Sequence, residues 1–295
     1  MTRQLIQTNY IYLWCEAFGK REDTPILLIQ GSGAQGILWL SEFCEKLAQN
    51  GFYVIRYDHR DTGQSSYVDY NKNPYQLKDL MEDAKGILDK LGLEKAHIIG
   101  SSMGGYIAQL LSIHYSKRVL SLTLMMSSFL SISLEHAFLE SNNTLPLPLP
   151  TKAFTDSLLK IGPVPQTQEG LISYMLAIWS AYNGETSSFD HVYWTSLAKQ
   201  WVTRTKDLSA SYNHRLAVSA SPLNRESGLQ AVHISTLIIH GLLDPFFPIE
   251  HAHALQNTFS SSTLNIIEKM GHLFHEAFID EVLDAIICHL KQHDA

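Results

Sequence analysis

Cysteine is scarce in this sequence, and its three residues, Cys15, Cys44 and Cys288, lie far apart. An odd number of cysteines at these spacings forms neither a disulfide framework nor a metal-ligand pattern. Each cysteine is therefore expected to be a small buried hydrophobic residue, and no metal site is predicted. This cysteine usage is typical of a reducing cytoplasm, where we expect the protein to reside.

Basic residues and long apolar runs are also in short supply. The chain has 22 Lys and Arg against 29 Asp and Glu, a formal charge of -7, and no basic cluster, which argues against nucleic-acid binding. The apolar run at residues 10–15 is soon interrupted by Glu16, too early for a signal peptide or a membrane span. We therefore expect neither nucleic acid nor a membrane as a partner.

What the chain does have is the composition of a globular protein with a substantial core. Of its 295 residues, 45% are hydrophobic and 17% charged, which excludes broad disorder. This length fits one large domain, or one domain that carries an insertion.

Strand and helix patterns alternate in both terminal parts of the chain. Residues 4–8 and 10–18 predict a hairpin, and continuous apolar runs predict buried strands. Such strands are predicted at 25–29, 51–55, 96–99, 119–126, 236–240 and 263–267, with helices at 39–49, 77–91, after residue 102, at 249–257 and at 274–292. The alternation predicts an α/β fold, with a mostly parallel central sheet flanked by helices.

The alternation stops in the middle of the chain. Residues 127–228 lack clear strands, begin with a proline-rich piece at 145–150, and continue with helical patterns. We predict a helical cap over 127–228, inserted into a core made of residues 1–126 and 229–295. Most aromatic residues of this insert are expected to form its own core, but Trp179 and Trp194 are candidates to line a substrate pocket.

The motif that organises the chain is Gly-Ser-Ser-Met-Gly at residues 100–104. It follows a buried strand and opens a helix, the context of a nucleophile elbow that exposes the hydroxyl of Ser102 above the sheet. The N-terminus of the following helix favours negative charge at the same place. The alternative is a glycine-rich turn with an inert serine.

A serine nucleophile needs a base, and the base needs an acid to orient it. In a parallel sheet these partners are expected just beyond the carboxyl ends of later strands. Asp244 and His272 occupy such positions. The order Ser102, Asp244, His272 is the one that the elbow motif requires, so we predict a catalytic triad of these residues.

Other carboxylates fit the acid position less well. Some sheets place the acid after the preceding core strand, but Ser127 and Ser128 stand there. Asp190 and Asp207 fall inside the insert and are expected to be solvated.

Other histidines are expected to be structural. His275 is predicted one turn into the last helix, and His97 and His240 lie in or beside strands. His251 and His253 are two apart on a predicted helix, so they cannot face one way to bind a metal.

Hydrolysis through an acyl intermediate also needs donors for the oxyanion. One is predicted to be the backbone N–H of Met103, and the other the N–H of Ser32, with that of Gly33 as the second choice. Gly31 and Gly33 let this loop approach the substrate closely, so both are predicted to contact it.

With these residues identified, the chain resembles the α/β-hydrolase superfamily, and within it the aclacinomycin methylesterase-like serine esterases. Residues 54–65 (VIRYDHRDTGQS), Ser102-Met103-Gly104 and Gly271-His272 carry this resemblance. It implies a serine hydrolase without a cofactor, a helical cap and a small ester as substrate. Gln30 stands where many relatives have histidine, which should alter the side-chain hydrogen bonds of the loop but leave the backbone donor intact.

The leading hypothesis is an esterase in which Ser102 forms an acyl-enzyme, His272 transfers the proton and Asp244 orients His272. The same triad would also serve an aminopeptidase, a perhydrolase or a C–C bond hydrolase. An aminopeptidase would need acidic residues near the pocket, such as Glu185 and Asp190. A third hypothesis is a non-catalytic ligand-binding protein on the same scaffold. Dehalogenase and epoxide-hydrolase chemistry is disfavoured, because each needs a carboxylate at the position of Ser102.

Overall fold

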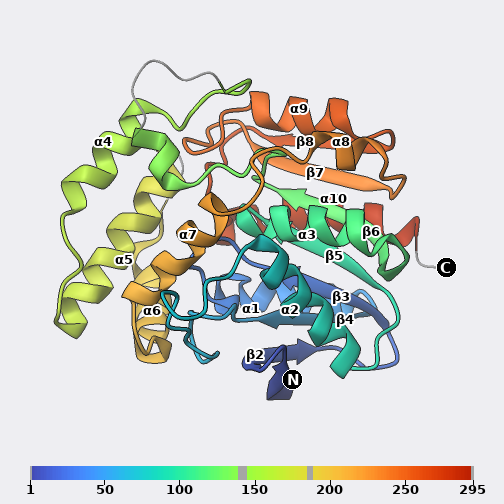
Figure 1. Cartoon of the computed structure of the whole chain (residues 1–295), viewed down its shortest axis with the longest axis horizontal. Helices are drawn as coiled ribbons and strands as arrows, with labels where there is room; N and C mark the ends of the chain where they lie inside the picture. The colour runs from blue at the N-terminus through green and yellow to red at the C-terminus, as the bar shows by residue number, and fades with distance from the viewer. Residues whose placement is uncertain (1, 139–144, 185–188, 294–295) are drawn as a thin grey trace.

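An eight-stranded sheet with the order β1-β2-β4-β3-β5-β6-β7-β8 forms the centre of the computed structural model, which describes residues 2–138, 145–184 and 189–293 (Figure 1). The pairs β1–β2 and β2–β4 are antiparallel, and the other neighbouring strands are parallel. The strands are β1 Thr2–Thr8, β2 Ile11–Phe18, β3 Thr24–Ile29, β4 Phe52–Tyr57, β5 Ala96–Ser101, β6 Val119–Met125, β7 Thr236–Gly241 and β8 Ser262–Ile267. The predicted fold class is confirmed.

Helices cover both faces of the sheet, which is why β4, β5 and β7 are buried along their whole length. Contacts join α1 to α10, and on the other face join α2 to α3, α3 to α8 and α8 to α9. These helices are α1 Ser41–Gln49, α2 Leu77–Lys90, α3 Met103–His114, α8 Glu226–Gln230, α9 Glu250–Thr258 and α10 Ile279–Lys291. Within the described residues, no helix is both long enough and apolar enough to cross a membrane.

The chain between β6 and β7 forms a group of helices at one end of the sheet (Figure 1). They are α4 Lys152–Ile161, α5 Gln168–Asn183, α6 His191–Arg204 and α7 Asn213–Ser219. No strand is assigned in the described part of this segment, which we call the insert (residues 127–228). The predicted boundary at residue 228 falls inside α8, which packs on the core helices α3 and α9.

Polar contacts join the insert to loops at the carboxyl ends of the strands. Arg204, the last residue of α6, forms a 2.6 Å ion pair with Asp58 after β4. At the start of α7, Asn213 donates a 3.0 Å hydrogen bond to Asp61 in the same loop. The insert therefore lies against the edge of the sheet where the candidate site residues were expected.

Short 3-10 turns account for the main differences from the predicted helix boundaries. The last helix begins at Ile279 rather than at residue 274, and a 3-10 turn at Glu276–Phe278 precedes it. His275 is therefore not inside this helix; its Nδ1 accepts a hydrogen bond from the N–H of Ala277 and caps the turn. The other 3-10 turns are Gly36–Leu38, Ser116–Arg118, Leu134–Phe138 and Ser209–Tyr212.

Candidate active site

Ser102 occupies a strained turn between β5 and α3. Its φ of 54° and ψ of −119° lie in a region that residues other than glycine rarely adopt, so neighbouring contacts must hold it there. The N–H of Ser102 donates a 2.9 Å hydrogen bond to the carbonyl oxygen of Met125. The hydroxyl of Ser127 donates a 2.9 Å hydrogen bond to the carbonyl oxygen of Ser102. The turn also requires glycine, because a Cβ on Gly104 would lie 2.1 Å from the carbonyl oxygen of Ile29.

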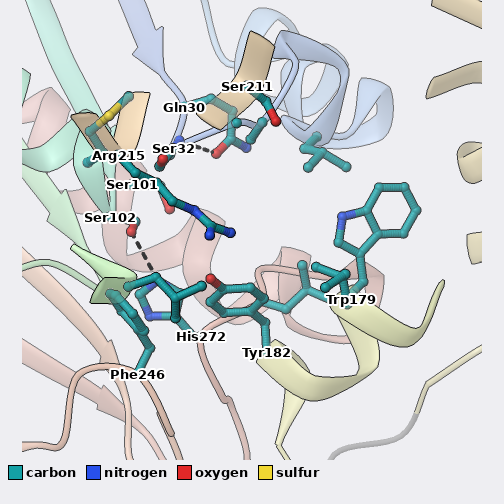
Figure 2. Close-up of a pocket in the computed structure, with 18 of the residues that line it drawn as sticks. Gln30, Ser32, Ser101, Ser102, Trp179, Tyr182, Ser211, Arg215, Phe246 and His272 are labelled. Carbon is teal, nitrogen blue, oxygen red and sulfur yellow. Dashed lines mark hydrogen bonds between the residues drawn. The ribbon is translucent and has the colours of Figure 1, made fainter. Parts of the chain in front are cut away.

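Ser102, His272 and Asp244 form a continuous chain of hydrogen bonds. The Ser102 Oγ lies 3.0 Å from Nε2 of His272 (Figure 2), and Nδ1 of His272 lies 2.7 Å from Oδ2 of Asp244. An ionised carboxylate can only accept, so the imidazole proton must be on Nδ1. Nε2 is then free to accept the hydrogen bond from the serine hydroxyl.

The loop after β7 keeps the Asp244 carboxylate ionised although it is fully buried. Burial by itself would raise its pKa, but His272 and the N–H of Phe247 favour the charged form, and the pKa lies below its ordinary value. Oδ1 accepts hydrogen bonds from the N–H groups of Phe246 (2.8 Å) and Phe247 (2.7 Å). The carboxylate therefore has donors on both oxygens, which fixes its orientation toward the imidazole.

The main chain of His272 is held by the insert. Its N–H donates a 2.8 Å hydrogen bond to the carbonyl oxygen of Tyr182, near the end of α5. The rings of Tyr182, Phe246 and Phe247 lie 5.1–5.5 Å from the imidazole, centroid to centroid. These aromatic contacts limit the movement of the imidazole and its access to bulk water.

Of the three backbone N–H groups at residues 31–33, in the loop after β3, one is available. The Gly31 N–H donates to the side-chain oxygen of Gln30 at 2.7 Å, and the Gly33 N–H donates to Nδ1 of His214 at 2.9 Å. Among the described residues, the N–H groups of Ser32 and Met103 have no hydrogen-bond partner. This excludes Gly33, the second choice in the sequence, as an oxyanion donor and leaves the two preferred positions open.

Ser102 and His272 face a cavity of about 320 Å³ (Figure 2). Gly31, Gly33 and Trp179, which the sequence predicted as substrate contacts, line this cavity. Trp194 does not. It is fully buried behind Trp179, with ring centroids 5.2 Å apart, and its Nε1 donates to Glu276. The prediction for Trp194 is therefore wrong: helical spacing cannot tell which of two neighbouring aromatic rings faces the cavity.

Two functional candidates, His214 and Arg215, were missed by sequence reasoning. Both belong to the short helix α7, and Arg215 lines the cavity. His214 reaches the Gly33 N–H and also donates from Nε2 to the carbonyl oxygen of Arg60 at 2.7 Å. No motif marks either residue, because only the folding of the insert brings them to the loop after β3.

The competing histidines have structural partners. His97 contacts the hydroxyl of Ser121, and His251 lies between Ser128 and the carbonyl oxygen of Pro148. Burial lowers the pKa of His251 to about 4. His240 donates to the carbonyl oxygen of Phe247, and burial lowers its pKa too. The neutral imidazoles of His240 and His251 support the loops around the site.

The competing carboxylates lie away from Ser102. Asp190 accepts hydrogen bonds from the N–H groups of Val192 and Tyr193 and so caps α6. Asp207 accepts a hydrogen bond from the hydroxyl of Ser209. Glu185 lies outside the described residues.

Comparison with known proteins places this geometry in a family. Residues 24–277 match the family model described as the alpha/beta hydrolase fold. The chain belongs to the α/β-hydrolase family. Among curated relatives, this α/β hydrolase is 32% identical to the rhodomycin D methylesterases DnrP of Streptomyces peucetius and DauP of Streptomyces sp. strain C5. In both cases the match spans 292 residues, 98% of this chain and 97% of the relative.

Solved structures agree with this α/β-hydrolase fold. A hydrolase from Pseudomonas aeruginosa matches with a TM-score of 0.74 and 20% identity over 98% of both chains. A thermophilic esterase from Thermogutta terrifontis matches with a TM-score of 0.74 and 21% identity over the full length of both. Together with the family match, the full-length methylesterase relatives support a hydrolase of carboxylic esters.

Proposed function

We propose that this α/β hydrolase is a serine esterase that cleaves a small carboxylic ester through an acyl-enzyme on Ser102. The observation that carries the proposal is the chain of hydrogen bonds from Ser102 through His272 to Asp244, at 3.0 and 2.7 Å. A hydroxyl, an imidazole and a buried carboxylate in this order can generate a serine nucleophile at neutral pH.

The proposed reaction begins with attack of the Ser102 Oγ on the ester carbonyl carbon. His272 Nε2 takes the hydroxyl proton and passes it to the leaving alcohol, while Asp244 stabilises the imidazolium. The N–H groups of Ser32 and Met103 donate to the oxyanion of the tetrahedral intermediate. Water then attacks the acyl-enzyme, with His272 as the base, and releases the acid.

The insert supplies much of the proposed substrate pocket. We assign residues 127–228 as a cap over the core, since Trp179, Trp201 and Met175 of the insert line the same cavity as Ser102. The apolar character of these residues suits a bulky acyl group. The two full-length relatives are methylesterases, and a methyl ester would leave most of the cavity to the acyl part.

The other reactions open to the same triad have less support. An aminopeptidase would hold a free amine with a carboxylate, but no Asp or Glu lines the described part of the cavity. A relative 26% identical over 86% of this chain is a 2-hydroxy-6-oxononadienedioate hydrolase from Pseudomonas putida. C–C bond cleavage should therefore be assayed beside ester hydrolysis, and so should perhydrolysis.

Hydrolysis of a short-chain p-nitrophenyl ester tests the proposal. Ser102→Ala should lower kcat by about a thousandfold or more, and a fluorophosphonate probe should label the wild type at Ser102 only. Ser157→Ala, which changes an exposed serine on α4, is the matched control and should keep wild-type turnover. Undiminished turnover by Ser102→Ala would rule the mechanism out, and absence of labelling would favour a non-catalytic binding protein.

A further inference from the structure

Among the residues that the structure describes, one permanently charged side chain enters the cavity. Among the described residues that line it, Arg215 is the only lysine, arginine, aspartate or glutamate. Its guanidinium extends into the space between Ser102 and Trp179, and the hydroxyl of Tyr182 points toward it (Figure 2). A ligand large enough to fill the cavity would therefore contact this cation.

Within the described part of the chain, Arg215 differs from the other arginines in having no hydrogen-bond or ion-pair partner. Arg56, Arg60 and Arg204 each form an ion pair with a buried carboxylate, and Arg225 donates to three neutral groups. Arg215 forms no hydrogen bond or ion pair with any residue that the structure describes. Besides the ring of Tyr212, 5.7 Å away, this half-buried guanidinium has no hydrogen-bond acceptor to replace lost water, so a ligand anion would complete its surroundings.

The charge of the whole chain makes this cation more notable. With a formal charge of -7, the protein as a whole repels anions. An anionic ligand would therefore need a local positive charge to enter the cavity, and Arg215 supplies one beside Ser102.

We propose that Arg215 binds an anionic oxygen group on the acyl part of the substrate, so that the enzyme acts on esters that also carry a carboxylate or an ionised phenol. This inference rests on the proposed esterase function and adds the substrate class. The guanidinium can form two parallel hydrogen bonds with a carboxylate, which would fix the distance from the anion to the ester carbonyl at Ser102.

There are two alternatives to anion recognition. Arg215 could act on the oxyanion, or it could be a solvated charge whose guanidinium lies 5.7 Å from the ring of the exposed Tyr212. Stabilisation of the oxyanion would speed the hydrolysis of charged and neutral esters alike. A solvated charge would change the hydrolysis rate of neither ester. The ratio between a charged ester and its neutral analogue therefore separates these roles from anion recognition.

The test uses matched pairs of methyl esters. The monomethyl esters of isophthalic and terephthalic acid carry a carboxylate, and their carboxamide analogues have nearly the same shape without the charge. For each pair we expect the ratio of kcat/KM, charged over neutral, to fall about tenfold or more in Arg215→Gln. Arg215→Lys should keep part of the ratio, because it retains the charge but not the two-pronged geometry.

Lys160→Gln is the control, since it removes one exposed positive charge from α4 of the insert, outside the cavity. It should leave the ratio at the wild-type value. Methyl para-hydroxybenzoate, assayed below and above the pKa of its own phenol, which the para ester group lowers from the ordinary value of about 10, distinguishes an ionised phenol from a carboxylate as the bound group. A ratio that is the same in Arg215→Gln and in the wild type overturns the proposal.

A binding measurement keeps this result independent of the triad. In a Ser102→Ala background, quenching of the fluorescence of Trp179 and Trp201 reports binding of the monomethyl esters without turnover. The Kd should rise about tenfold or more when Arg215→Gln is added. An unchanged Kd contradicts anion recognition, whereas unchanged turnover by Ser102→Ala contradicts the esterase mechanism alone.

Discussion

The backbone N–H of His272 and the carbonyl oxygen of Tyr182 form a 2.8 Å hydrogen bond that joins the proposed base to the insert. Tyr182 is the penultimate residue of α5, and the chain packs so tightly there that a Cβ on Gly271 would lie 2.1 Å from the carbonyl oxygen of Asn183. The position of the imidazole thus depends on two parts of the chain, the loop after β8 and the end of α5.

Gly271→Ala tests this dependence. The added Cβ meets backbone that cannot rotate away, so the loop that carries His272 must shift from α5. We expect kcat/KM to fall at least about tenfold, because a shift near 1 Å in a reacting group can cost about a hundredfold. Gly228→Ala is the control, since the nearest atoms to its Cβ would belong to the side chain of Ile113 rather than to backbone. Equal activity of both variants would contradict the prediction.

Asp244→Asn tests the acid of the proposed triad. An amide can donate to Nδ1 of His272 and favour the wrong tautomer, while the loop keeps nearly the same shape. We expect kcat to fall by about a thousandfold to ten-thousandfold with little change in KM. Circular dichroism and the urea midpoint check that the variant is folded, and a folded variant with wild-type kcat would exclude Asp244.

His214 is predicted to position the loop that presents the Ser32 N–H. Replacing it with alanine leaves the Gly33 N–H without its acceptor, at a cost of about 1–3 kcal/mol. We expect kcat to fall about tenfold in His214→Ala. His214→Asn, whose side-chain oxygen can replace Nδ1 as the acceptor, should recover part of that loss. A loss of stability without any change in kcat would indicate a purely structural role.

Acid should destabilise the protein through histidines that are buried in the neutral form. Burial lowers the pKa to about 3 for His59 and to about 4 for His214, His251, His275 and His289. In the unfolded chain the pKa of each of these histidines returns to about 6.5, so the unfolded state binds more protons than the folded state below that pH. The contribution of these histidines to the free energy of unfolding should level off above about pH 6.5, and the free energy of unfolding should fall from there toward about pH 4.

The contribution of one histidine can be isolated with His251→Asn. Urea midpoints measured across this pH range should fall less steeply in the variant, because one proton-binding group has been removed. Each such histidine contributes up to about 1.4 kcal/mol per pH unit to the slope. Identical slopes in the variant and the wild type would show that His251 has the same pKa in the folded and unfolded states, which contradicts the prediction.

The ion pair between Arg204 and Asp58 should couple the insert to the core. Arg204→Met alone leaves a buried carboxylate unpaired and should destabilise the protein by about 3 kcal/mol or more. Asp58→Asn in the same chain removes that charge, so the double variant should be less destabilised than the sum of the two single variants. Urea unfolding of the four proteins gives the coupling energy, and strict additivity would mean that the pair contributes nothing.

The elements that repeat a local pattern were predictable from the sequence. The apolar runs of β3, β5 and β7 predicted buried strands, and glycine at 100 and 104 around Ser102 predicted the elbow between a strand and a helix. Asp244 and His272 followed from one rule, that polar residues after parallel strands meet at the same edge of the sheet. These features depend on near neighbours in the chain, whose effects can be read in order.

The insert could not be predicted in the same way. Whether Trp179 or Trp194 faces the cavity, and whether Gly33 keeps its N–H free, depends on contacts between residues far apart in the chain, such as Gly33 and His214. Sequence alone determined the sheet, the elbow and the candidate triad, because strand burial and tight turns are set by local residue type. Only the tertiary structure decided which side chains of the insert reach Ser102, because packing between distant helices leaves no periodic pattern in the sequence.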